Sequence, residues 1–131
     1  MSPVLRWGLL AGMVVMLVDT VTVMISQGFP ADSEAAQTFQ MIDTAASVFL
    51  YAFAGFRAGR AAGITRAGAE AGVIAGVLAG VLAAILAYVL PGAEGGAPNP
   101  IGLIALNVAL GGVLGVFNGW LGSRIPDAPQ R

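Results

Sequence analysis

Four long apolar segments, separated by short polar stretches, make up most of the chain. They cover about residues 4–26, 39–56, 67–90 and 101–121. Each is close to the roughly 20 residues that an α-helix needs to cross about 30 Å of hydrocarbon. The pattern therefore predicts an all-α fold, an integral membrane four-helix bundle that forms a single domain over residues 1–131.

The ends of these segments carry recognisable helix signals. Ser2-Pro3 and Asn99-Pro100 each place an N-cap residue before a proline at the first helical position. The second helix is expected to begin at Asp32 or Ser33, in the interface, and to run to about Arg60. Pro91-Gly92 should end the third helix at Leu90. The first segment is too long for the apolar core of a signal peptide, so we expect it to stay as a membrane helix.

Small residues recur at regular spacing in two of the segments. The third segment has a glycine at every fourth position, and the first has a shorter version of the same pattern. This spacing keeps the glycines near one face of a helix, where the backbone of a partner helix can approach closely. We expect a helix-packing surface along these residues, which are Gly8, Gly12, Gly68, Gly72, Gly76 and Gly80.

The chain also resembles itself when residue i is compared with residue i+64. Gly12 then aligns with Gly76 and Arg60 with Arg124, without a gap. Each half would contain one helical hairpin, so the two repeats would run parallel, related by an axis along the membrane normal. The predicted halves are residues 1–64 and 65–131.

The arginines orient the predicted bundle. All six basic residues are arginines, and all fall on one side of the membrane if the four segments cross it. The most basic stretch is the predicted turn from Arg57 to Arg66, which contains Arg60 and is suited to lipid headgroups. Since arginine-rich loops stay inside, both termini and this turn should be cytoplasmic in what we expect to be a prokaryotic plasma membrane. The opposite loops carry Asp32, Glu34 and Glu94.

Composition excludes several functional classes. The chain is 57% hydrophobic and 10% charged, with a net charge of −1, so it offers no basic surface for nucleic acid. It contains neither cysteine nor histidine, which removes thiolate chemistry and the common catalytic pairs. We therefore expect a protein that is not an enzyme and needs neither a cofactor nor a metal.

Two carboxylates lie within the predicted spans. Asp19 and Asp43 are 13 and 14 residues from Arg6 and Arg57, so both sit about 20 Å from the arginine side at about 1.5 Å per residue. At equal depth they can face each other, and two carboxylates close together in a low dielectric repel until one holds a proton. The fourth segment offers Asn107, which aligns with Asp43 in the repeat, and Asn118 as further polar partners.

These four residues suggest a proton or cation site, because ionisable groups at membrane depth are costly and are often functional. The alternative is structural: the carboxylates lie near the outer interface, where water or the asparagine amides satisfy them, and they fix the helix register. Two functions follow. The first is association through helices, as a homo-oligomer or with other membrane subunits in the lipid bilayer. The second is a small proton- or cation-linked transporter or channel that uses Asp19 and Asp43.

Overall fold

A computed structural model of the chain describes residues 1–89 and 99–125, and it is all-helical there. Each of its four helices is long and apolar enough to cross a membrane. This confirms the predicted all-α membrane bundle. The helices are α1 (Pro3–Ser26), α2 (Glu34–Ala62), α3 (Thr65–Val89) and α4 (Pro100–Ser123).

Side-chain caps start three of the helices. The Ser2 hydroxyl accepts a hydrogen bond from the Leu5 amide at 3.3 Å, and the Asn99 side chain accepts one from the Ile101 amide at 3.1 Å. Ser33 caps α2 in the same way, which decides between the two predicted candidates, Asp32 and Ser33. Such caps satisfy amide groups that have no partner inside the helix.

The connection between α2 and α3 is shorter than expected. α2 continues to Ala62, and Gly63 ends it in the left-handed conformation with φ 68°. The predicted turn from residue 57 to 66 is therefore wrong in its extent, since Arg57 and Arg60 are still helical and Arg66 already belongs to α3. The helix continues through Arg57 and Arg60 because no residue before Gly63 ends it. The predicted end of the third helix at residue 90, and most of the loop after it, lie outside the described residues.

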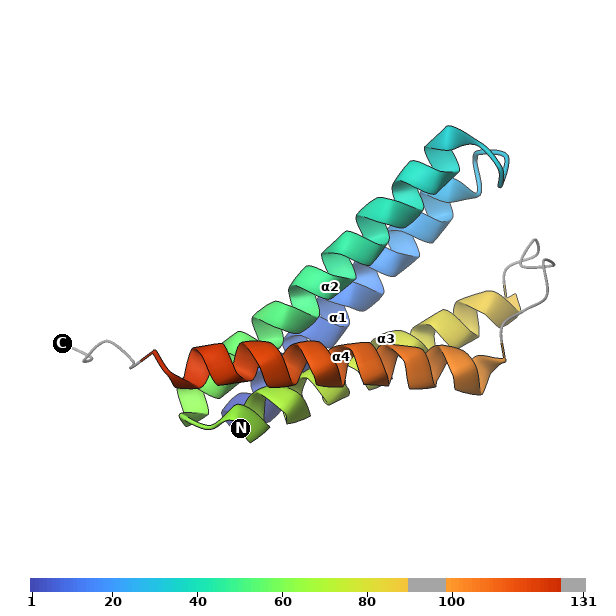
Figure 1. The fold of residues 1–131 in the computed structure, drawn as a ribbon. Coiled ribbons are helices and arrows are strands. Elements are labelled where there is room, and N and C mark those ends of the chain that lie inside the picture. The colour runs from blue at the N-terminus through green and yellow to red at the C-terminus, as the bar shows by residue number, and fades with distance from the viewer. Residues whose placement is uncertain (90–98, 126–131) are drawn as a thin grey trace.

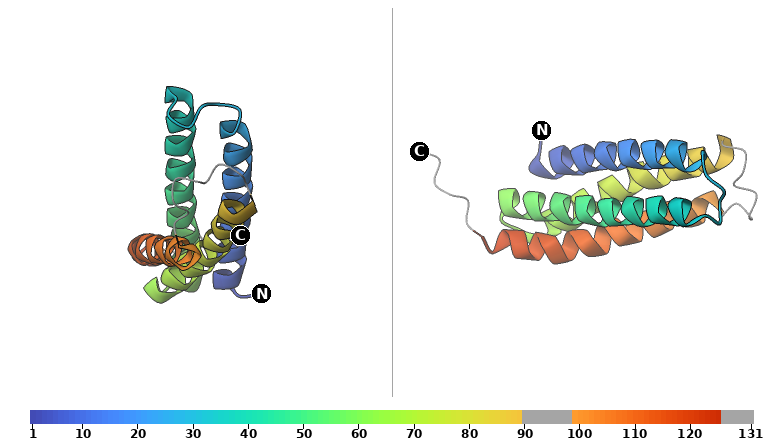
Figure 2. Two further views of the ribbon diagram at one scale, coloured as in Figure 1. Left: turned by 90° about the vertical axis from the view of Figure 1, so that its right-hand side faces the viewer. Right: turned by 90° about the horizontal axis from the view of Figure 1, so that it is seen from above.

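The helices form two hairpins that cross each other. α1 lies along α2, and α3 lies along α4 (Figure 1). The hairpins meet near the N-terminus and the α2–α3 connection, and they diverge toward the α1–α2 loop, as the end-on view in Figure 2 also shows. α2 and α3 each contact all three other helices, whereas α1 and α4 do not touch within the described part of the chain. α2 and α3 are thus the inner helices, and α1 and α4 the outer ones.

The closest packing joins α3 to α4 through glycines. A methyl group added at Gly68 would come within 2.6 Å of the Gly115 carbonyl oxygen, and one added at Gly80 within 2.7 Å of the Ile104 Cα. At Gly72 and Gly76 an added methyl group would run into the backbone of α4 even more severely. Only glycine permits this approach, which provides the van der Waals contact that holds helices together in lipid.

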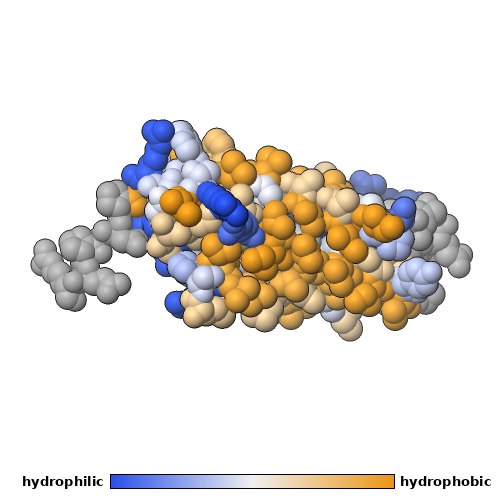
Figure 3. Space-filling model, turned by 90° about the horizontal axis from the view of Figure 1, so that it is seen from below, coloured by the Kyte–Doolittle hydropathy of each residue, from blue (hydrophilic) through white to orange (hydrophobic). Residues whose placement is uncertain are grey.

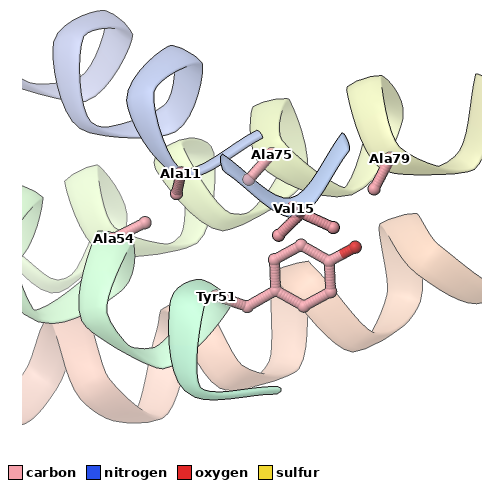
Figure 4. Packing of buried hydrophobic residues seen from close by; sticks show 6 residues of the cluster. All are labelled: Ala11, Val15, Tyr51, Ala54, Ala75 and Ala79. Atoms are coloured by element: carbon pink, nitrogen blue, oxygen red, sulfur yellow. The ribbon is translucent and has the colours of Figure 1, made fainter. Parts of the chain in front are cut away.

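The neighbouring row of α3 consists of alanines and faces the other hairpin. Ala75 and Ala79 belong to a buried cluster with Ala11 and Val15 of α1 and with Ala54 and Tyr51 of α2 (Figure 4). Tyr51 is 1% exposed and is the largest side chain in this cluster. One face of α3 thus carries two rows of small residues, of which the glycine row meets α4 and the alanine row meets α1 and α2.

Large apolar side chains cover the outside of the bundle. The middle of the face shown in Figure 3 is hydrophobic, and its hydrophilic residues gather near the ends. Leu17, Phe49 and Val113 are each about two-thirds exposed. A soluble protein rarely presents so much apolar surface, but hydrocarbon accepts it without cost. The surface therefore fits a multi-pass membrane protein.

Candidate functional site

The two intramembrane carboxylates lie on neighbouring helices. Asp19 is in the C-terminal half of α1 and Asp43 in the N-terminal half of α2, and their carboxyl groups are close enough to interact directly. The Ser47 hydroxyl, one turn further along α2, donates a long hydrogen bond of 3.5 Å to the Asp19 Oδ1. The structure therefore brings together the two acidic residues that the sequence placed at equal depth.

One oxygen of this pair lacks a partner. The Asp43 Oδ1 is buried and accepts no hydrogen bond from any described group. Buried polar atoms are normally paired, because an unpaired one costs about 1–3 kcal/mol. A proton on either carboxyl group would convert that group into a donor. A proton held by the pair would therefore let the two carboxyl groups share a hydrogen bond.

Tyr51 connects this region to the second hairpin. Its hydroxyl donates a hydrogen bond of 2.8 Å to the Asn107 Oδ1 on α4. The Asn107 amide nitrogen in turn donates to the Leu103 carbonyl oxygen of its own helix at 3.0 Å, which holds the side chain in one orientation. This contact links α2 of the first hairpin to α4 of the second.

The asparagines do not supply the carboxylates with donors. Asn107 donates one of its two amide hydrogens to the Leu103 carbonyl oxygen and Asn118 donates one to the Leu114 carbonyl oxygen, each at 3.0 Å, and among the described residues neither amide is hydrogen-bonded to Asp19 or Asp43. Asn118 also lies 11 residues beyond Asn107, about 16 Å along the helix at about 1.5 Å per residue. The structure thus links Asn107 to the site through Tyr51 and places Asn118 in a separate part of α4.

Ser47 and Tyr51 were not among the candidate site residues in the sequence analysis. A signal for them is present, since Asp43, Ser47 and Tyr51 follow each other at four-residue spacing on α2 and so share a face. Serine and tyrosine are common in membrane helices and do not by themselves indicate a site. Their role becomes visible only when α1 places Asp19 next to Ser47 and α4 places Asn107 next to Tyr51. The partner glycines of α4 were missed in the same way, although Gly111, Gly115 and Gly119 repeat the four-residue spacing.

The remaining candidate residues lie at other contacts. Gly8 and Gly12 pack on α3, where added methyl groups would meet the Ala71 carbonyl oxygen at 2.9 Å and the Leu78 side chain at 2.6 Å respectively. Arg66 forms an exposed ion pair of 2.6 Å with Glu70, one turn along α3, which the sequence analysis did not consider.

Together, α1 and α2 present a pair of carboxyl groups inside a membrane bundle, with a serine donor beside them. Within residues 1–89 and 99–125, no three acidic, histidine or cysteine side chains lie close enough together to hold a metal ion. In comparisons with known proteins, no family model, curated protein or solved structure gives a significant match to the chain.

Proposed function

We propose that this protein is a small proton- or cation-linked membrane transporter or channel in which Asp19 and Asp43 form the binding site. The observation that carries the proposal is the buried, unpaired oxygen of Asp43 beside a second carboxyl group. Carboxylates that served only to fix helix register would be expected to have permanent donors. Here no described group donates to the Asp43 Oδ1, and the Asn107 amide is hydrogen-bonded within its own helix instead.

The position of the carboxyl pair along its hairpin supports the same proposal. The pair lies nearer the α1–α2 loop than the opposite end of these two helices, so it is nearer to one side of the membrane than to the other. The two hairpins separate toward that loop (Figure 1). Four helices are few to enclose a pathway, so we expect the working unit to be a dimer.

Measurement of proton flux in reconstituted vesicles tests this function. A pH-sensitive dye inside the vesicles should report flux for the natural protein, and Asp19→Asn and Asp43→Asn should each abolish it while leaving a folded protein. Asp32→Asn is the matched control, because Asp32 is exposed in the α1–α2 loop. Equal flux in all four proteins would refute the proposed site.

A second candidate function is association with itself or with other membrane subunits. It is favoured by the outer half of the α1–α2 hairpin, which extends away from α3 and α4 and exposes Met24, Met41 and Phe49. The glycine row of α3 does not favour it, since α4 already covers that row. Native mass after mild detergent extraction distinguishes the two candidates: a stable larger complex whose formation does not depend on Asp19 would support association.

The orientation that we propose follows from the charges at the two ends of the bundle. Five described arginines lie at the end where the hairpins meet, and Asp32 and Glu34 lie at the other. Since basic residues stay inside, the former end should be cytoplasmic. Cysteine labelling is direct in this cysteine-free chain: Ser33→Cys should react with an impermeant reagent added outside intact cells. Labelling of Ser33→Cys from the cytoplasm alone would reverse the orientation.

We also propose that the two hairpins are repeats. The corresponding helices α2 and α4 run side by side in the same direction, as a parallel repeat requires. The aligned glycines Gly55 and Gly119 both lie at this contact, where a methyl group on Gly55 would come within 2.6 Å of the Gly115 Cα.

A further inference from the structure

Two arginines converge on one tryptophan at the end of the bundle where the hairpins meet. The guanidinium carbon of Arg57 lies 4.6 Å from the centre of the Trp7 ring, and that of Arg6 lies 5.5 Å from it. Phe53 packs edge-on against the same ring, with centroids 5.7 Å apart, and so holds Trp7 in place. The result is a small surface of two positive charges on a fixed aromatic platform, which we call the Trp7 platform.

The Trp7 platform has no counter-charge in the described chain. Neither Arg6 nor Arg57 forms an ion pair with a described carboxylate, whereas Arg66 is paired with Glu70. The tryptophan ring attracts each guanidinium through its negative face, but it carries no net charge and cannot neutralise two cations. Both guanidinium groups lie against the same ring, and positive charge that no described carboxylate offsets attracts an anion next to a low-dielectric membrane.

We propose that the Trp7 platform binds the phosphate group of an anionic phospholipid. Trp7 is in the second turn of α1, so the site lies at a helix end, at the level where tryptophan rings meet lipid headgroups. A guanidinium group can donate two parallel hydrogen bonds to phosphate oxygens and offsets the negative charge of a phosphodiester, and the second arginine beside Trp7 adds to the attraction. The acyl chains of the lipid would continue along the apolar outer surface of α1 and α2.

Lipid rather than free phosphate is the occupant that this position favours. Anionic lipids are concentrated at the cytoplasmic surface of the membrane, where basic residues near helix ends attract them. Arg57 is half-buried on α2 and Trp7 is half-buried on α1, so a bound headgroup would touch both helices of this hairpin. The choice of lipid rests on the orientation proposed above, but it does not depend on the function assigned to Asp19 and Asp43.

Lipid binding to variants in detergent tests the proposal. Binding of phosphatidylglycerol is measured by native mass spectrometry and by the shift in thermal unfolding, with phosphatidylcholine as the neutral comparison lipid. Arg57→Gln removes one guanidinium from the site and should weaken phosphatidylglycerol binding about tenfold, as loss of a charge-assisted hydrogen bond predicts. Arg66→Gln is the matched control, because it removes the same charge from an exposed ion pair and should leave binding unchanged.

The other possible results of this experiment also support or overturn the lipid site. If Arg57→Gln does not fold, Arg6→Gln takes its place, since Arg6 is exposed near the start of α1 and its loss should still weaken binding. Equal losses in Arg57→Gln and Arg66→Gln would show attraction by net charge alone and would overturn the site. Equal binding of both lipids would do the same. A thermal shift reproduced by inorganic phosphate alone would overturn the assignment to a lipid.

Discussion

The two hairpins are built from similar apolar helices but are held together in different ways. Between α3 and α4 the backbones are in contact, with Gly72 against Gly111 and Gly68 against Gly115. Between α1 and α2 the contacts use side chains, such as Trp7 with Phe53, and Phe29 of the connecting loop stacks on Phe39 of α2. The acidic pair Asp19 and Asp43 lies between these aromatic contacts along the hairpin.

This difference indicates which hairpin can tolerate new side chains, rotamer changes or changes in protonation. Backbone contact between glycines is specific in geometry, because any side chain at the contact forces the helices apart. Side chains can change rotamer, and carboxyl groups can gain or lose a proton, without such disruption. We therefore expect the α3–α4 hairpin to serve as a rigid base and the α1–α2 hairpin to carry the functional chemistry.

The largest expected effect comes from placing a side chain in the glycine contact. Gly72→Ala should destabilise the protein by about 1–3 kcal/mol, because the new methyl group meets the Gly111 backbone, which has no rotamer to change. Gly12→Ala in α1 should cost less, since its nearest neighbour is the flexible end of the Leu78 side chain at 2.6 Å. Unfolding in mixed micelles, followed by circular dichroism, measures both.

Gly112→Ala serves as the control for this comparison. Its methyl group would lie 3.4 Å from a Val73 side-chain carbon, which is ordinary contact, and alanine favours the helix by up to about 1 kcal/mol. We expect stability that is unchanged or slightly higher. Equal stability of Gly72→Ala and Gly112→Ala would show that the α3–α4 contact is not the rigid part of the protein.

A smaller effect is expected where the two hairpins join. Tyr51→Phe keeps the ring in the buried cluster but removes the 2.8 Å hydrogen bond to Asn107. The expected loss is about 0.5–1.5 kcal/mol, since hydrogen bonds between membrane helices contribute modestly. The same unfolding measurement applies, and Tyr88→Phe is the control because Tyr88 is exposed at the end of α3. No difference between the two variants would mean that this hydrogen bond does not couple the hairpins.

The smallest effect on stability is expected at the carboxyl pair itself. Asn has the shape of Asp and adds an amide donor, which can satisfy the free oxygen of Asp43. Asp19→Asn should therefore change the free energy of unfolding by less than about 0.5 kcal/mol, within the range of a well-tolerated substitution. Its stability should also vary less with pH than that of the natural protein. A large loss of stability would instead identify Asp19 as a structural residue of the α1–α2 hairpin.

Local structure was predictable from the sequence because its causes are local. A helix crosses the membrane when about 20 consecutive residues are apolar, whatever lies beside it. Capping by Ser2 and Asn99 likewise depends only on neighbours along the chain, and both caps were predicted. The equal depth of Asp19 and Asp43 followed from counting residues along helices of fixed rise.

Tertiary structure alone decided which faces meet. Four-residue glycine spacing occurs on α3 and on α4, but the spacing does not indicate which helix packs on which row. From the sequence alone, α4 could equally have packed on the alanine row of α3. Similarly, Tyr51 is an ordinary aromatic residue until α4 brings Asn107 within 2.8 Å of its hydroxyl. The sequence determined the helices and their depth through local physics, whereas pairing of distant surfaces depends on the shapes of all four helices at once.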